Sequence, residues 1–350
     1  MQRMRGTTSL ISGLGRLIRF SFLALLLAAC ASPSPPERLP TRAPTPTHTP
    51  TPTLFPISAQ TYYEDGLARQ RAGDAAGALQ SFSWAIQRSP DLVPAYVARG
   101  TVHLGRGELA QALADADAAL EADEASAAAK AAAYALRGEV LRLLGRADPA
   151  LKAFDEALAL DPALRAETFR SRWLAARLAH RGGRLLALGA EYASAHPDDP
   201  LRHYYHAWAF IEGGTPGAAI EVLVEGIETT PHPPALLWFA LGRAYMEARA
   251  WKESVTALEA ARVPVQGGDT SLALHSDQPI AELFSTLGQA YLGAGRCVDA
   301  EAMLQYATDV LVRDVGAPAS VYTATVGQAR LCQTPTPTAT PYPTTTPYVW

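Results

Sequence analysis

Residues 134–162 read YALRGEVLRLLGRADPALKAFDEALALDP, and their spacing decides the fold. The bulky and small residues that recur at helical spacing in this stretch are Tyr134, Gly138, Leu141, Ala150, Phe154 and Ala157. They form two groups, each at intervals of three or four residues, as on one face of a helix. Gly145 separates the groups, where a left-handed residue can end the first helix. The stretch therefore predicts two packed antiparallel helices.

The same pattern recurs along the chain with a period near 34 residues. The first two copies carry Tyr62, Gly66, Ala78, Phe82, Ala85, Pro90, Tyr96, Gly100, Ala112 and Ala119. The fifth copy carries Ala207, Phe210, Ala219, Leu223 and Pro231, and the last two contain WFALGRAY at 238–245 and FSTLGQAY at 284–291. The fourth copy fits at Leu174, Ala175, Leu178 and Ala187 only if its frame shifts by two, so it predicts two helices without their register. Repeats of this length predict a stacked array of identical units.

These residues resemble the tetratricopeptide repeat. The resemblance implies an all-α fold: a right-handed superhelical solenoid of antiparallel helix pairs, with about seven repeats and a C-terminal capping helix. Small residues would let the helices approach, and bulky residues would fill the remaining gaps. Gly73, Gly107, Gly145, Gly214 and Gly295 share the position that ends the first helix of a pair. We expect this solenoid to occupy residues 57–332.

The resemblance also implies a concave groove lined by the first helix of each pair. Matched to this sequence position by position, the candidate groove residues are Tyr63, Arg71, Glu139, Arg142, Tyr204, Trp208, Phe239, Arg243, Met246 and Glu247. Aromatic and arginine side chains are common anchors in protein interfaces, so this set predicts a protein or peptide partner. The alternative for any one of them is packing against a neighbouring helix. The lysine and asparagine that bind a peptide carboxylate in some members of the family are absent here.

The first thirty residues predict export. Arginines precede an apolar run from Phe20 to Ala29, which is too short to span a bilayer as a helix. Leu27-Ala28-Ala29-Cys30 resembles the lipobox of bacterial lipoproteins, which implies cleavage after Ala29 and lipid on Cys30. An ordinary cleaved signal is the alternative. We therefore expect a signal peptide over 1–29 and an extracytoplasmic protein anchored by lipid to the cell membrane or the outer membrane.

Two segments rich in proline and threonine flank the predicted solenoid. Residues 30–56 form a spacer behind the lipidated cysteine, and residues 333–350 form a similar tail. Alternating Pro and Thr favours an extended polyproline II conformation and cannot pack a core. We expect the spacer to hold the solenoid away from the membrane.

Three further features bear on the chemistry. Cys297 and Cys332 are a candidate disulfide that would fix the capping helix, with two free thiols as the alternative. About twelve extra residues lie within 264–279, and we expect a surface loop there, although long insertions in solenoids can lie on the binding face. His203 and His206 share a helical face but lack further metal ligands at suitable spacing, so we expect them to pack in the ordinary way.

No catalytic motif accompanies the repeats, and the net charge of −4 gives no basis for nucleic-acid binding. We expect no enzyme activity, cofactor or metal. The leading hypothesis is a lipid-anchored scaffold that binds a partner protein in its groove, in an envelope assembly or adaptor role. The alternatives are a lipoprotein that binds a cell-surface glycan, a peptidoglycan fragment or a peptide and, third, an accessory subunit of an enzyme.

Overall fold

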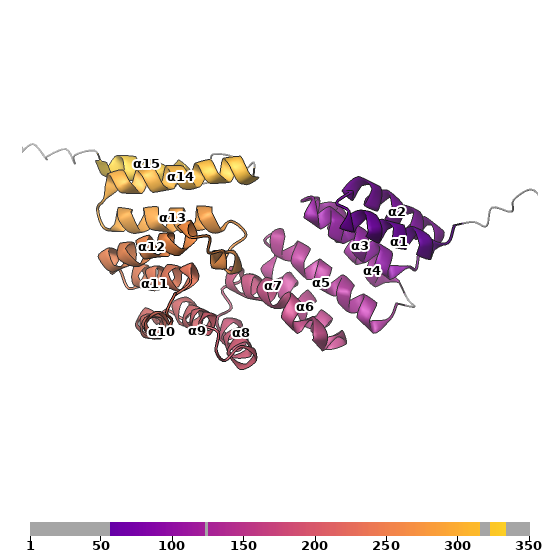
Figure 1. The fold of residues 1–350 in the computed structure, drawn as a ribbon, viewed down its shortest axis with the longest axis horizontal. Helices are drawn as coiled ribbons and strands as arrows, with labels where there is room; N and C mark the ends of the chain where they lie inside the picture. Colours follow the sequence, from indigo (N-terminus) through magenta and orange to yellow (C-terminus); the bar gives the residue numbers. More distant parts are fainter. Residues whose placement is uncertain (1–56, 123–124, 316–322, 334–350) are drawn as a thin grey trace, which may run out of the picture. The chain divides into compact units, whose positions relative to one another are not determined.

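The computed structural model describes residues 57–122, 125–315 and 323–333, which form helices and turns without a strand (Figure 1). The helix pairs are α1 Ala59–Arg71 with α2 Ala75–Arg88, α3 Val93–Gly105 with α4 Leu109–Glu121, α5 Ala127–Leu143 with α6 Ala147–Leu160, α7 Arg165–Leu178 with α8 Gly182–Ala195, α9 Leu201–Glu212 with α10 Pro216–Thr229, α11 Ala235–Glu247 with α12 Trp251–Gln266, and α13 Pro279–Gly293 with α14 Cys297–Val315. Helix α15, Thr323–Gln333, follows. The predicted fold of helix pairs is confirmed.

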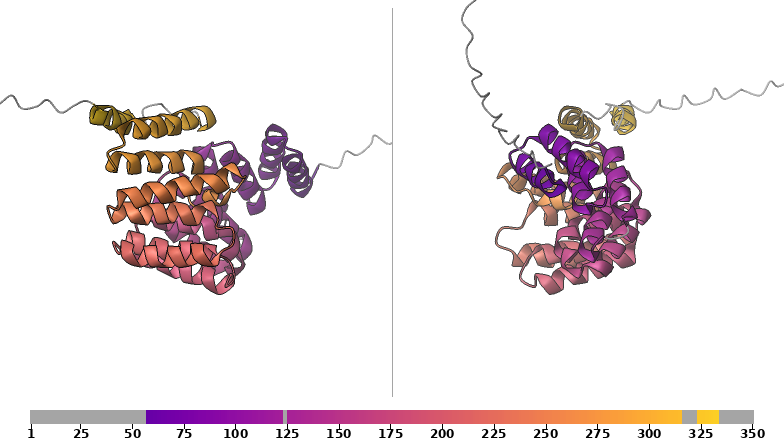
Figure 2. Two further views of the ribbon diagram at one scale, coloured as in Figure 1. Left: turned by 60° about the vertical axis from the view of Figure 1, so that its left-hand side comes forward. Right: turned by 90° about the vertical axis from the view of Figure 1, so that its right-hand side faces the viewer.

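Successive helices pack against one another, as Figure 2 shows for the layers formed by the last helices of the chain. The first helices of neighbouring pairs also meet, since α3 contacts α1 and α5, α5 contacts α7, and α11 contacts α9 and α13. We call the surface formed by α1, α3, α5, α7, α9, α11 and α13 the odd-helix face. It is the face that the sequence predicted to be concave, and it carries the candidate groove residues.

In the first and third pairs, a glycine of the first helix packs against a large ring of the second. In α5, the Cα of Gly138 lies so close to α6 that a Cβ added there would come within 2.8 Å of the Phe154 ring. Gly66 has the same relation to Phe82 in the first pair, at 2.5 Å. Both rings are buried. The spacing of small and bulky residues in the sequence therefore corresponds to direct contacts.

The turn between the helices of a pair requires a left-handed residue. The five glycines predicted for this position all have positive φ, between 71° and 79°. In the fourth and sixth pairs the same place is taken by His180 and Arg249, with φ of 51° and 56°. The turn geometry is thus kept even where the sequence provides no glycine.

The structure resolves the register of the fourth pair. Because His180 occupies the turn position, the glycine expected seven residues earlier is replaced by Trp173, which is fully buried. The frame drawn from the sequence was wrong at Leu178, which is 49% exposed, and at Ala187, which is also exposed. In the fourth pair the large ring thus comes from the first helix, whereas in the first and third pairs it comes from the second helix, as Phe82 and Phe154.

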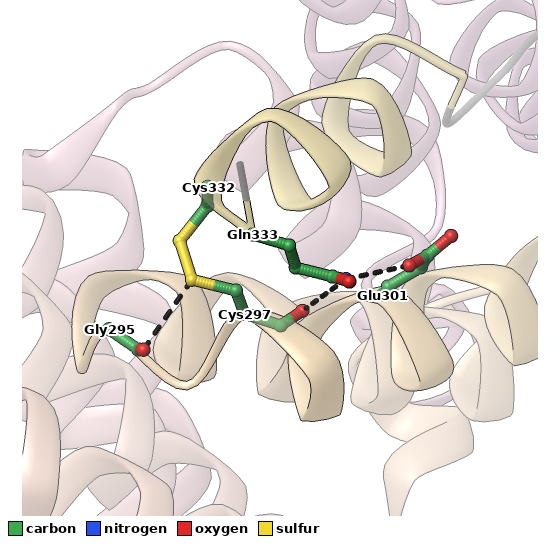
Figure 3. The surroundings of a disulfide bond; sticks show 5 residues. All are labelled: Gly295, Cys297, Glu301, Cys332 and Gln333. Atoms are coloured by element: carbon green, nitrogen blue, oxygen red, sulfur yellow. Dashed lines mark hydrogen bonds between the residues drawn. A yellow bond between two sulfur atoms is a disulfide. The ribbon is translucent and has the colours of Figure 1, made fainter. Parts of the chain in front are cut away.

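Helix α15 caps the last pair. A disulfide joins Cys297, at the start of α14, to Cys332, with 5.6 Å between their Cα atoms (Figure 3). Gln333 donates a hydrogen bond to Glu301 of α14 at 2.7 Å, and the buried Ala329 of α15 belongs to the main hydrophobic core. The bridge and these contacts hold α15 against the end of the solenoid.

Within the described residues, no helix is both long and apolar enough to cross a membrane. The predicted signal peptide, Cys30 and both Pro/Thr-rich segments lie outside those residues, apart from Gln333 at the end of α15.

The contact between Gly138 and Phe154 predicts a cost for any side chain at position 138. Gly138→Ala should lower the free energy of unfolding by about 1–3 kcal/mol, because the added methyl overlaps the ring. Gly183→Ala in α8 is the matched control, since a Cβ at that position meets nothing within 4 Å. Urea unfolding of the two variants measures the difference, and equal stabilities would contradict the packing argument.

Candidate functional site

A segment between α12 and α13 lies on the odd-helix face. We call residues 267–278 the strap; it contains a short 3-10 helix, η2, from Ser271 to Leu274. Leu272, His275 and Ser276 are buried, at 3%, 2% and 8% exposure. The expected surface loop was therefore wrong, because the middle of this insertion packs against the helices that the sequence predicted to line a groove.

The first part of the strap caps α11. That helix begins after Pro234, which gives it no side-chain cap. Asp269 accepts a hydrogen bond from the backbone N–H of Ala235 at 3.1 Å, and Ser271 Oγ accepts one from Leu236 at 3.1 Å. Because the first backbone N–H groups of a helix have no partner within it, the strap supplies acceptors that α11 itself lacks.

The last part of the strap binds two arginines of earlier repeats. Asp277 accepts hydrogen bonds from Arg142 of α5 at 2.5 Å and from Arg170 of α7 at 2.9 Å. Arg170 also donates to the backbone carbonyl of Ala273 at 2.8 Å. Burial alone would raise the pKa of Asp277, but the hydrogen bonds from the two guanidinium groups outweigh it, so that the pKa lies below its usual value.

His275 occupies the centre of the strap. Its Nδ1 lies 2.7 Å from the Tyr204 hydroxyl, and the Arg177 guanidinium lies against both ring nitrogens. The rings of Trp208 and Phe239 pack edge-on at 4.5 and 4.7 Å between centroids. The pKa of His275 is lowered to about 4, chiefly because the ring is buried and secondly because Arg177 is positively charged. The imidazole is therefore neutral at pH 7.

Four candidate groove residues are covered and not open to solvent. Tyr204, Trp208 and Phe239 are 0%, 3% and 1% exposed, and Arg142 is 6% exposed. The expectation of an open aromatic groove at these positions needs correction, because the strap of the same chain lies over them. They do come together on one face, as the repeat pattern predicted.

The other candidates are dispersed. Glu139 holds Arg142 through two hydrogen bonds of 2.7 and 2.9 Å. Tyr63 packs against Phe82, with 6.0 Å between the ring centroids, and Arg71 is exposed at the end of α1. On α11, the remaining candidates are Arg243 and Glu247, which form an ion pair at 3.4 Å, and the partly buried Met246, which packs on the core. Their part in binding stays a prediction.

An open pocket lies among the odd helices of the second, third and fourth pairs. It has a volume of about 380 Å³. Its lining comes mainly from α3, α5 and α7 and consists of Val97, Thr101, Leu104, Ala132, Ala135, Leu136, Glu139, Phe154, Leu164, Glu167, Thr168 and Ser171. We call it the α3–α5–α7 pocket. It is largely apolar and includes two carboxylates, Glu139, which is paired with Arg142, and the exposed Glu167.

Sequence reasoning named only Glu139 among these lining residues. The others went unnamed because the sequence criteria favour aromatic and charged side chains, whereas most of this lining is aliphatic or carries a hydroxyl group. The signal was nevertheless present. Val97, Thr101, Leu104 and Ala135 occupy repeat positions equivalent to those of the named groove residues.

The histidines considered as metal ligands pack in other ways. His203 is 9% exposed and lies against Gly226, whereas the His206 ring packs at a tilt against Phe210 with 5.0 Å between centroids. In the part of the chain that the structure describes, no three His, Cys, Asp or Glu side chains are grouped as metal ligands would be.

Comparisons with known proteins agree with this architecture. Residues 131–164 match the family model of the tetratricopeptide repeat. A 95-residue stretch is 34% identical to human tetratricopeptide repeat protein 36; it covers 27% of this chain and spans about half the length of that relative. The crystal structure of a tetratricopeptide repeat protein from Parabacteroides merdae superposes with a TM-score of 0.62 at 15% identity, over 78% of this chain and 98% of that one. The chain thus has the tetratricopeptide-repeat fold, which suggests a scaffold for protein interactions.

The environment of His275 predicts a pH dependence. The folded pKa, about 4, lies below the ordinary value of 6.5, so the buried neutral ring favours the folded strap above pH 6.5. As the pH falls from 6.5 towards 4, this contribution to the free energy of unfolding is lost. The loss is about 3 kcal/mol in total, because each unit of pKa difference corresponds to 1.36 kcal/mol. Urea unfolding or strap hydrogen exchange between pH 7.5 and 4 measures the loss.

His275→Gln is the matched variant, since glutamine keeps a polar side chain that does not titrate. Its stability should fall less than that of the wild type over the same interval. The carboxylate of Glu282, 3.5 Å from Nε2, and the guanidinium groups of Arg177 and Arg243 remain in both proteins. Parallel pH profiles would show that His275 does not titrate as argued.

Proposed function

We propose that this protein is a lipid-anchored, extracytoplasmic scaffold that binds a partner polypeptide on its odd-helix face, in an envelope assembly or adaptor role. The observation that carries the proposal is the α3–α5–α7 pocket. It lies across three consecutive repeats, so a chain segment bound along the face would meet all of them. Its largely apolar lining suits apolar side chains, and the exposed carboxylate of Glu167 favours a partner segment that also carries a basic residue.

The location is supported by independent features. The disulfide between Cys297 and Cys332 is typical of proteins that work in an oxidising compartment outside the cytoplasm. The lipobox-like sequence before Cys30 provides the means of anchoring, and residues 31–56 are a spacer long enough to separate the solenoid from the lipid. Together they favour attachment of the chain to the outer side of a membrane.

The glycan-binding alternative needs an exposed aromatic platform in the groove, where Tyr204 and Trp208 are the neighbouring candidates. Both rings are buried under the strap, so this platform is not available to a sugar. Binding of a polypeptide is therefore the function that the geometry supports best.

The binding proposal is tested by filling the pocket. Ala135→Arg places a long side chain among Thr101, Glu139 and Ser171, and it should reduce capture of partner proteins from solubilised membranes at least tenfold. Quantitative mass spectrometry of material bound to the full chain measures the change. Ala110→Arg, an exposed position on the neighbouring second helix α4, is the matched control. If Ala135→Arg retained the partners of the wild type in full, the pocket would not be the binding site.

The anchor is tested separately. Metabolic labelling with an alkyne fatty acid should mark the wild type and should leave Cys30→Ser unlabelled, because the thiol is the point of attachment. Membrane fractionation of the same cells follows the consequence, since one or more acyl chains retain a protein on the bilayer. Equal labelling of both proteins would place the lipid elsewhere, and no labelling of the wild type would remove the anchor.

A further inference from the structure

We propose that the surface beneath the strap is a second peptide site, which the strap occupies as an intramolecular ligand and from which an acidic segment of a partner protein displaces it. The inference rests on the proposed role as a protein-binding scaffold and specifies partner chemistry and regulation for one region. The residues that form this site are Arg142, Arg170, Arg177, Tyr204, Trp208 and Phe239, from helices α5, α7, α9 and α11. We call it the strap site.

The contacts of the strap resemble those of a bound peptide. Asp277 meets two arginines from two different repeats, and Arg170 also binds the strap carbonyls of Ala273 and, at 3.4 Å, Ser276. His275 enters between Tyr204, Trp208 and Phe239. One carboxylate, nearby backbone carbonyls and one side chain in an aromatic pocket are the features by which such a face would recognise a segment from another protein.

The charge of the site indicates which segments it accepts. Arg142, Arg170 and Arg177 face the strap, while the nearby carboxylates are Glu139, which is held by Arg142, and Glu282, beside His275. The three guanidinium groups outnumber these carboxylates. A partner segment that carries an aspartate or glutamate in the place of Asp277 therefore fits, and a basic segment does not.

Two hydrogen-bond donors of the strap site lack a good acceptor on the strap. Among the described residues, no carboxylate lies within 4.0 Å of the Arg177 guanidinium, which instead contacts the neutral His275 ring and lies 5.7 Å from the centre of the Trp208 ring. The buried Nε1 of Trp208 has no hydrogen-bond acceptor in the same part of the chain. An unpaired buried donor weakens binding, so the strap is a poorer ligand than a segment that supplies the missing acceptors.

The decisive probe is a synthetic peptide of residues 269–279, DTSLALHSDQP, with a fluorescent label. Three full chains are compared by fluorescence anisotropy: the wild type, the Asp277→Asn variant, and a variant that lacks residues 266–277. The deletion removes twelve residues and restores the repeat period. We expect the deletion variant to bind the peptide most tightly. The Asp277→Asn variant should bind the peptide more weakly than the deletion variant does. The wild type should bind the peptide at least tenfold more weakly than the deletion variant does.

A matched peptide with asparagine in place of the residue corresponding to Asp277 tests the charge. It should bind the deletion variant about tenfold more weakly or worse, because hydrogen bonds between charged groups contribute more than neutral ones. Equal binding of the two peptides would overturn the assignment of an acidic ligand. Absence of peptide binding by the deletion variant, with helical content unchanged by circular dichroism, would overturn the site itself.

Hydrogen exchange on the wild type tests displacement without any deletion. Amides of residues 271–278 should exchange through local opening, faster than those of α11 and α13, and Asp277→Asn should accelerate this exchange at least tenfold while α3 stays unchanged. If the strap amides exchanged only when the whole protein unfolds, the strap would be a permanent part of the core. That result would contradict the proposal. Capture of partners through the α3–α5–α7 pocket would survive that result, so the two proposals fail separately.

Discussion

The close approach of two helices at a residue without a side chain is the constraint on which this structure depends. A single amphipathic pair leaves one apolar face uncovered, and only stacking against the next pair buries it. Gly138 against Phe154 shows how the approach is achieved, with the ring of α6 seated directly on the backbone of α5. The consequence for function is geometric. Because each pair is positioned by its neighbours, the odd helices form one continuous face on which side chains from distant repeats can act together.

The repeat period predicted this fold well because the period arises from contacts between residues that are close in the sequence. Small and large residues at fixed intervals specify each pair, and five glycines mark the turns between helices. The register of the fourth pair could not be read in this way. There, Trp173 replaces the small residue and His180 adopts the left-handed turn, so the two strongest markers are missing although the geometry is kept.

The candidate site was harder to predict for a related physical reason. The strap begins with Gly267, Gly268 and Asp269, a composition typical of solvent-exposed turns, and only Leu272 and Leu274 in it are strongly apolar. Its position is set by contacts with residues more than one hundred positions away, such as Asp277 with Arg142. No periodicity in a single sequence reports such a contact. Composition thus favoured a solvent-exposed loop, and the surface against which this segment packs could only come from the tertiary structure.

One ion pair joins the two proposed binding regions. Glu139 lines the α3–α5–α7 pocket and holds Arg142, whose other partner is Asp277 of the strap. A partner segment that draws Glu139 into its own contacts would therefore weaken the support of the arginine that binds the strap.

This connection bears on how a tethered strap could be displaced. A segment linked to its own site competes at an effective concentration in the millimolar range, which a free partner in solution rarely matches. A partner already bound in the α3–α5–α7 pocket has the same advantage. The residues that follow its bound segment are then tethered near the strap site, much as the strap itself is. Occupation of the open pocket would then be the step that makes exchange at the strap site possible, so the two regions would act in sequence along one face.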